Sequence, residues 1–265
     1  MMTHSAIENH RVVAGPTVRF ESLLATLGIT CEGEKSGSAS SDFGLSQEAF
    51  TLVEAEGRLE LRPPGEAENS GISAHFPPDR FVGKGSKSIL VRAFGKKANV
   101  IFDLTAGLGG DAYRLARSGH QVFASERDSA IYALLISGWE RDRELGNVDL
   151  EVSKRLEFSQ EEGARVLDQI DQADIGVYLD PMYPRPRRHK ALPKRELQVL
   201  RQLLGDDEDD AAVLLELARL RAARVVVKRP HRAPPLLPDV SFALSTKLVR
   251  LDVYVNPDLM QAASS

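Results

Sequence analysis

Short apolar runs alternate with amphipathic, helix-like stretches from residue 99 onward. Apolar runs of this length favour strands that are buried on both faces, and their alternation with helices is typical of a mostly parallel sheet covered on both sides. The pattern therefore predicts an α/β fold. The expected strands are 100–104, 121–125, 150–158, 175–179 and 224–227, and the expected helices are 111–118, 128–144, 161–170, 194–204 and 211–222.

The two ends of the chain follow a different pattern. Residues 242–246 and 248–255 alternate between apolar and polar side chains, like two antiparallel strands. Alternation on either side of Glu56-Gly57 predicts a β-hairpin, and a short helix is expected at 88–94. We therefore expect a small N-terminal α+β subdomain, residues 1–85, and a larger domain, residues 86–265, whose parallel sheet ends in an antiparallel hairpin.

Composition narrows the class of protein. The 265 residues, 42% of them hydrophobic and 27% charged, are enough to build a buried core. A formal charge of −4 excludes a protein coated in positive charge, although not a local basic patch. The single cysteine, Cys31, excludes an internal disulfide framework, and the scattered histidines predict no metal site. Because no signal peptide and no apolar run of about 18 residues is seen, a cytoplasmic protein without a membrane partner is expected.

A glycine-rich turn, DLTAGLGGDA at 103–112, directly follows the first strand of the predicted parallel sheet. Glycines at this place let the backbone approach a ligand closely, with a helix N-terminus behind it. Gly107, Gly109 and Ala112 also fit the G-x-G-x-x-A pattern of NAD sites, and an ordinary tight turn is a further alternative. Glu126, at the end of the second strand, can accept hydrogen bonds from both ribose hydroxyls of a nucleoside, unless it is only a solvated carboxylate.

The fourth predicted strand of this sheet ends in Asp180-Pro181-Met182-Tyr183-Pro184. Ligands of open α/β sheets bind beyond the carboxyl ends of the strands, so this turn and the glycine turn should face one crevice. The Asp180 carboxylate and the Pro181 carbonyl can accept hydrogen bonds from an exocyclic amine, and Tyr183 can stack on a base. These three are the candidate catalytic residues, although a proline-rich loop with Tyr183 in the core is the alternative.

Basic side chains follow this turn. The stretch 185–195 holds six Lys or Arg residues, and the predicted strand at 224–227 leads into two more. Neutralisation of phosphates beside a base pocket would hold a polynucleotide in register without reading its sequence, whereas a solvated charged loop needs no ligand. The candidate RNA-binding residues are Arg185, Arg187, Arg188, Lys190, Lys228 and Arg229.

In their order and spacing, the segments DLTAGLGGDA, ASER, YLDPMYP and VVVKRP resemble the bacterial small-subunit (16S) rRNA guanine-N2 methyltransferase family of the RsmJ type. The resemblance covers about residues 81–255. It implies a Rossmann-like, S-adenosylmethionine-dependent methyltransferase fold and transfer of a methyl group to N2 of one guanosine near the 3′ end of 16S rRNA. The implied cofactor is S-adenosylmethionine. The implied partner is 16S rRNA or the small ribosomal subunit, with no metal and no stable protein partner.

The resemblance also assigns cofactor contacts. Together with the glycine turn, it gives the candidate cofactor-binding residues Asp103, Gly107, Gly109, Gly110, Asp111, Glu126, Arg127, Glu162, Gly163 and Asp180. The family usually has other residues at three of these positions, Gly110, Glu162 and Gly163. A cofactor contact through the backbone would survive such differences, whereas a contact through the side chain would not.

Three other functions are compatible with parts of the sequence. A DNA adenine-N6 or cytosine-N4 methyltransferase would use the same Asp-Pro-x-Tyr turn. An NAD(P)-dependent oxidoreductase would use the glycine turn, although the sequence shows no catalytic Tyr-x-x-x-Lys and no obvious His/Asp pair. A non-catalytic RNA-binding module would retain only the fold.

Overall fold

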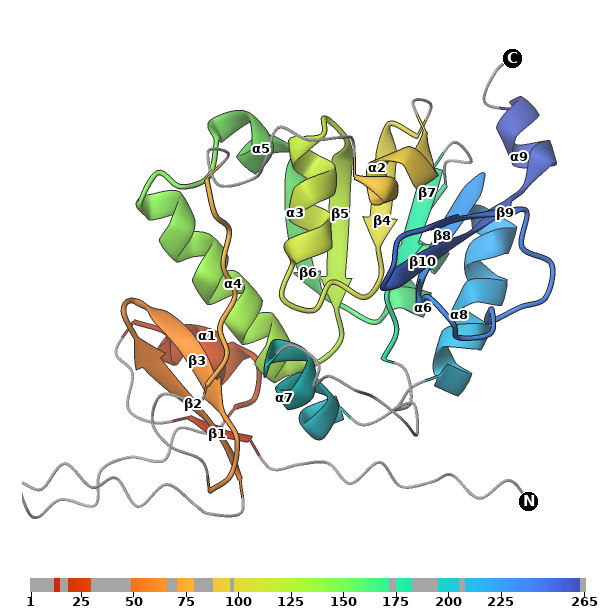
Figure 1. Ribbon diagram of the computed structural model, residues 1–265. Helices are drawn as coiled ribbons and strands as arrows, with labels where there is room; N and C mark the ends of the chain where they lie inside the picture. Colours follow the sequence, from red (N-terminus) through yellow and green to blue (C-terminus); the bar gives the residue numbers. More distant parts are fainter. Residues whose placement is uncertain are drawn as a thin grey trace, which may run out of the picture.

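The computed structural model places the regular elements of the chain in two sheets with helices packed against them (Figure 1). Among the helices that it describes, none combines the length and the apolar composition needed to cross a membrane. The described residues are 12–14, 19–29, 49–65, 71–78, 88–95, 98–171, 175–182, 195–204 and 208–262.

The larger sheet has seven strands in the order β6-β5-β4-β7-β8-β10-β9. Successive strands in this order are parallel from β6 to β8, and β10 is antiparallel to both β8 and β9. The predicted α/β fold, with a mostly parallel sheet and a C-terminal antiparallel hairpin, is confirmed. The bounds are β4 Val100–Asp103, β5 Gln121–Glu126, β6 Leu156–Gln160, β7 Ile175–Leu179, β8 Arg224–Pro230, β9 Phe242–Ser245 and β10 Val249–Val255.

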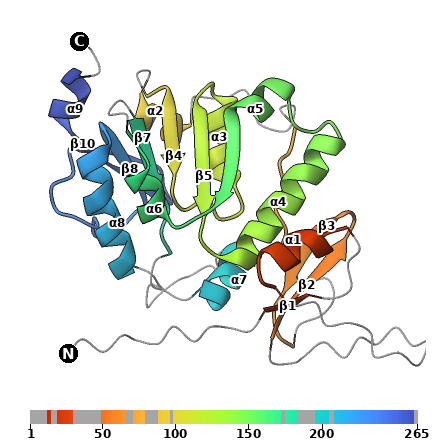
Figure 2. The ribbon, with the colours of Figure 1, turned by 180° about the vertical axis from the view of Figure 1, so that it is seen from behind.

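Helices cover both faces of this sheet (Figure 2). On one face α2, α3 and α4 contribute Phe94, Leu115 and Trp139 to a single buried cluster. On the other face α6 and α8 contribute Leu167 and Leu215 to a second cluster. The bounds are α2 Ile89–Phe94, α3 Gly110–Arg117, α4 Ser129–Glu144, α6 Gly163–Asp168, α7 Arg195–Leu204, α8 Glu208–Arg221 and α9 Pro257–Ala262.

The expectation of a strand over 150–158 is wrong for its first part. The segment begins with a short helix, α5 Leu150–Arg155, and only then continues as β6. The Asp149 side chain accepts a hydrogen bond from the Glu151 N–H and so caps the first turn. An aspartate directly before a segment favours a helix start, and this local signal outweighs the apolar content of the segment.

A smaller sheet of three strands, in the order β1-β2-β3, lies beside the large one (Figure 1). Its hairpin, β2 Phe50–Ala55 and β3 Arg58–Arg62, turns at Glu56 and Gly57, which both have positive φ. Two such residues form the tight turn that matches the twist of a hairpin, so the predicted hairpin is confirmed. β1 Val12–Ala14 and α1 Glu21–Thr26 complete this part. The domain boundary at residue 85 stays a prediction.

The long helix α4 joins the two parts. Its Ile131 and Leu134 share a buried cluster with Leu59 of the small sheet and Val199 of α7. Along the same helix, an added Cβ at Gly138 would overlap the backbone of Ala74. The glycine therefore allows the segment 71–78 to lie directly on α4, and this contact helps to hold the small sheet beside the large one.

Replacing Gly138 by Ala is expected to lower the free energy of unfolding by about 1–3 kcal/mol, the usual cost of overpacking a tight contact. Gly110→Ala is the matched control, because an added Cβ there meets no atom within 4 Å. The control should leave stability unchanged or raise it by up to about 1 kcal/mol. Urea denaturation measures both variants, and equal stabilities would contradict the close approach of α4 to Ala74.

Candidate active site

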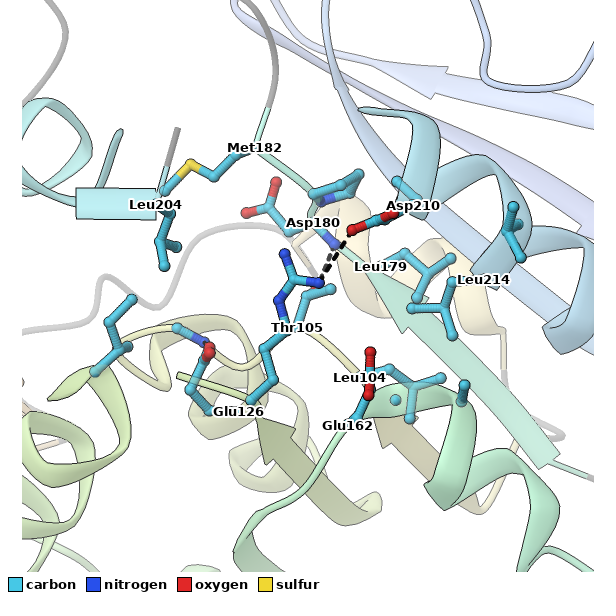
Figure 3. A pocket seen from close by; sticks show the side chains of 18 of the residues that line it. Leu104, Thr105, Glu126, Glu162, Leu179, Asp180, Met182, Leu204, Asp210 and Leu214 are labelled. Atoms are coloured by element: carbon cyan, nitrogen blue, oxygen red, sulfur yellow. Dashed lines mark hydrogen bonds and ion pairs between the residues drawn. The ribbon is translucent and has the colours of Figure 1, made fainter. Parts of the chain in front are cut away.

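Three neighbouring parallel strands end at one edge of the large sheet. β4 lies between β5 and β7, and its last residue, Asp103, is in register with Ala124 and Tyr178. The turns that follow these strands therefore approach one another. A cavity of about 280 Å³ opens at this edge, and both Gly107 and Asp180 line it (Figure 3). The glycine turn and the Asp180 turn thus face one cavity, as the sequence predicts.

Some of the candidate residues line the cavity and others do not. The lining includes Gly107, Glu126, Arg127, Glu162, Gly163, Asp180 and Pro181. The candidate cofactor-binding residues outside the lining are Asp103, Gly109, Gly110 and Asp111, and the RNA-binding candidates Lys228 and Arg229 also lie outside it. Sequence reasoning missed the apolar part of the wall, which α7 and α8 supply with Leu200, Leu204, Leu214 and Leu217. The leucines of α7 lie on an amphipathic helix, whereas α8 shows little amphipathic pattern, and neither pattern tells which part of the protein the helix faces.

Glu126 connects the end of β5 to the glycine turn. Its carboxylate is buried and accepts hydrogen bonds from the backbone N–H of Gly107, at 2.9 Å, and of Asp128, at 2.8 Å. Burial raises the pKa of Glu126 to about 7, although these two N–H groups oppose the shift. The side chain therefore lines the cavity as an acceptor whose charge changes near neutral pH.

Gly109 has a packing role. It adopts positive φ at the start of α3, and an added Cβ would overlap Leu135 of α4 and crowd the Phe76 ring. Only glycine combines that backbone conformation with so close an approach. Gly109 therefore fixes the turn against α4 and leaves the contact with the cavity to Gly107.

Asp180 is held from two directions. Its backbone N–H donates to the Thr105 hydroxyl at 2.7 Å, which ties the end of β7 to the glycine turn. Its Oδ2 accepts from the Lys228 Nζ at 2.6 Å. The same ammonium donates to Asp111 Oδ2 at 2.8 Å, and the Tyr178 hydroxyl donates to that oxygen, also at 2.8 Å. Asp111, which does not line the cavity, is thus connected to Asp180 through the Lys228 ammonium.

Asp103 lies beneath this group with an exposed fraction of 1%. Its Oδ1 accepts a hydrogen bond from the Thr105 N–H at 3.1 Å. The pKa of Asp103 is raised to about 8, mainly by burial and also by the nearby Asp111 and Asp180, although the Thr105 N–H and Lys228 oppose the shift. Asp103 is therefore largely protonated at neutral pH and shapes the turn without adding a full negative charge.

An ion pair between two lining residues forms part of the cavity wall. Arg127, next to Glu126, contacts Asp210 of α8 at 3.3 Å between the guanidinium and the carboxylate, and both residues line the cavity. Figure 3 shows Asp210 on the α8 side, with Glu162 on the loop before α6. Gly163 follows Glu162, and an added Cβ there would crowd Leu104 and Leu214. The first residue of α6 is thus packed tightly between β4 and α8.

Several candidates lie outside the described residues, namely Tyr183, Arg185, Arg187, Arg188 and Lys190. Two basic candidates of β8 are described. The expectation that Arg229 contacts RNA is wrong in this structure, because its exposed fraction is 1% and its Nε donates to the Pro234 carbonyl. Lys228 is partly exposed, but its ammonium is paired with carboxylates. Within the described part of the chain, no three His, Cys, Asp or Glu side chains gather as metal ligands.

Comparison with known proteins agrees with this geometry. Residues 42–256 match the model of the family described as "Putative SAM-dependent methyltransferase". The ribosomal RNA small subunit methyltransferase J of Haemophilus ducreyi is 38% identical over 221 residues, which are 79% of this chain and 86% of the relative. The protein of the same name from Chromohalobacter salexigens is 38% identical over 247 residues, 89% of this chain and 93% of the relative.

A solved structure shares the fold. The crystal structure of an SAM-dependent methyltransferase from Neisseria gonorrhoeae matches with a TM-score of 0.64 and 23% sequence identity. The match covers 92% of this chain and 96% of that chain. The arrangement of the sheet and its helices is therefore shared over nearly the whole of both proteins.

Replacing Asp103 by Asn is expected to stabilise the protein relative to wild type increasingly as the pH rises from about 4 to about 8. Over this range the unfolded chain has lost the Asp103 proton while the folded protein, with a pKa of about 8, retains it. Wild-type stability should therefore fall with a slope of at most about 1.4 kcal/mol per pH unit from this residue. Asn keeps the acceptor for Thr105 without titrating. Urea denaturation of both proteins at several pH values tests this, and a difference that does not change with pH would contradict it.

Proposed function

Because the chain belongs to the S-adenosylmethionine-dependent ribosomal RNA small subunit methyltransferase J family, we propose that it methylates the exocyclic N2 amine of a guanosine near the 3′ end of 16S rRNA. The observation that carries the proposal is the single cavity shared by the Gly107 turn and the Asp180 turn. The Gly107 turn offers close backbone approach and a hydrogen-bond acceptor for a nucleoside, and the Asp180 turn offers hydrogen-bond acceptors for an amine. A cofactor and a substrate bound at these two turns would be close enough for the methyl group to pass between them.

The cavity offers a suitable set of groups for S-adenosylmethionine. Glu126 would accept hydrogen bonds from the ribose hydroxyls, as strand-end acids do for nucleoside cofactors. Gly107 would let the backbone approach the cofactor, and Gly163 with Leu214 would form an apolar surface for the adenine. The cavity volume of about 280 Å³ is close to the lower end of the range for ligand sites, about 300–1,000 Å³. When bound, S-adenosylmethionine supplies an electrophilic methyl group on its sulfonium sulfur.

The Asp180 turn would orient the nucleophile. The guanine amine is weakly nucleophilic because its lone pair is delocalised into the ring. Hydrogen bonds from its N–H groups to the Asp180 carboxylate and the Pro181 carbonyl would direct the lone pair at the methyl group and stabilise the positive charge that develops. The new N–C bond forms as the C–S bond breaks, and the amine proton then passes to Asp180 or to water. Alignment of this kind is worth about 7–11 kcal/mol in favourable cases.

The RNA contacts belong to this proposal as well. Tyr183 would stack on the extruded base, and the basic stretch 185–190 would neutralise phosphates beside it. The two relatives are named for small-subunit rRNA, which favours RNA over the DNA alternative. The match to a methyltransferase family likewise disfavours an NAD(P)-dependent oxidoreductase.

Asp180→Ala is expected to lower kcat by about 10²–10³-fold, as loss of one preorganised electrostatic group does. The measurement is transfer of a labelled methyl group to purified 16S rRNA, with duplex DNA as the competing acceptor. Asp239→Ala is the control, because that exposed carboxylate pairs with Arg219 away from the cavity. Wild-type turnover by Asp180→Ala would contradict the catalytic role, and preferential labelling of DNA would contradict the substrate.

The affinity for S-adenosylhomocysteine is expected to rise between pH 6 and pH 8. With a pKa of about 7, Glu126 becomes a full carboxylate acceptor over this interval, and one proton can change affinity by up to about tenfold per pH unit. Glu126→Gln should abolish this dependence. Glu162→Gln, at an exposed position that lines the same cavity, should preserve it. Calorimetric titration provides the affinities, and an unchanged pH dependence in Glu126→Gln would disprove the assignment.

A further inference from the structure

Lys228 joins two acidic side chains from different elements. It lies in β8, beside the end of β7, and its Nζ contacts Asp180 Oδ2 at 2.6 Å and Asp111 Oδ2 at 2.8 Å. Asp111 is in the first turn of α3, whereas Asp180 follows β7 and lines the cavity. One ammonium therefore fixes the position of Asp180 relative to both α3 and β8.

The remaining neighbours of this group bind Asp111 or lie beneath it. The Tyr178 hydroxyl from β7 and the Arg114 guanidinium from α3 both donate to Asp111, and buried Asp103 ends β4 nearby. Burial lowers the pKa of Lys228, but Asp180 and Asp111 raise it by more, so the group stays charged. Burial raises the pKa of Asp111, while Lys228, Tyr178 and Arg114 lower it below its ordinary value.

We propose that Lys228 is a positioning residue for methyl transfer, which holds the Asp180 carboxylate ionised and oriented toward the substrate amine. The inference rests on the proposed function, in which Asp180 receives that amine. It replaces the sequence-based expectation that Lys228 binds an RNA phosphate. An ammonium already within hydrogen-bond distance of two carboxylates has its charge compensated, and a phosphate would have to displace one of them.

The two roles predict different kinetics. A phosphate contact contributes to RNA affinity, so its loss would raise the KM for RNA and weaken the salt dependence of binding. A positioning contact acts on the Asp180 carboxylate, so its loss lowers kcat. Removing a nearby positive charge also favours the protonated form of a carboxyl group, which moves the acidic limb of the pH–rate profile to higher pH.

The test compares Lys228→Met with Lys228→Arg in methyl transfer to 16S rRNA at several pH values. Lys228→Met should lower kcat by roughly 10–100-fold, the range for groups that orient a functional side chain. Its KM values should change little, and its acidic limb should move upward. Lys228→Arg keeps the charge but not the compact geometry, so its acidic limb should stay in place while kcat falls. Lys154→Met is the matched control, because Lys154 pairs with Glu151 on the exposed surface.

Other results would overturn the inference. These are a raised KM for RNA with unchanged kcat and pH profile, or wild-type kinetics in Lys228→Met. Binding of S-adenosylhomocysteine shows whether Lys228→Met is folded. If Lys228→Met is not folded, the kinetics of Lys228→Arg decide between the positioning role and the phosphate contact. The failures are distinguishable: no transfer to 16S rRNA by the wild type contradicts the proposed function. Transfer by the wild type with an unaffected Lys228→Met contradicts only the role of Lys228.

Discussion

The parallel pairing of β4, β5 and β7 brings the acidic ends of these strands to one edge of the sheet, and the site depends on how their charges are accommodated. Two like charges about 4 Å apart near a protein surface repel by about 4 kcal/mol. The charge of each acidic side chain is compensated in a different way. Asp103 is buried and largely protonated, Glu126 is held by backbone N–H groups, and Asp180 is paired with Lys228.

As a result, the cavity has two parts, each with its own hydrogen-bond acceptor. Glu126 presents a hydrogen-bond acceptor beside the glycine turn, where the proposed nucleoside would bind, and Asp180 presents one beside Pro181, where the proposed substrate amine would bind. Thr105 connects the sides, since its hydroxyl accepts from the Asp180 N–H while its own N–H donates to Asp103. Acids whose surroundings separate their pKa values are typical of sites in which each has its own task.

Local sequence predicted most of the strands, the hairpins and the positions of Glu126 and Asp180, because periodicity and strand ends are short-range properties. The pairs Lys228–Asp180 and Arg127–Asp210 could not be predicted, since they depend on the strand order and on where α8 lies. Arg229 shows an available signal that was missed. Successive strand residues point to opposite faces of the sheet, so the sequence already indicated that Lys228 and Arg229 do not share one surface.

The proposed reaction requires that one cavity present the methyl donor to the Asp180 turn. A crystal structure with bound S-adenosylhomocysteine would show whether it does. We expect the ribose hydroxyls on the Glu126 carboxylate and the sulfur on the side of Asp180 and Pro181. A ligand bound outside this cavity, or one whose sulfur points toward Glu162 and α8, would contradict the claim.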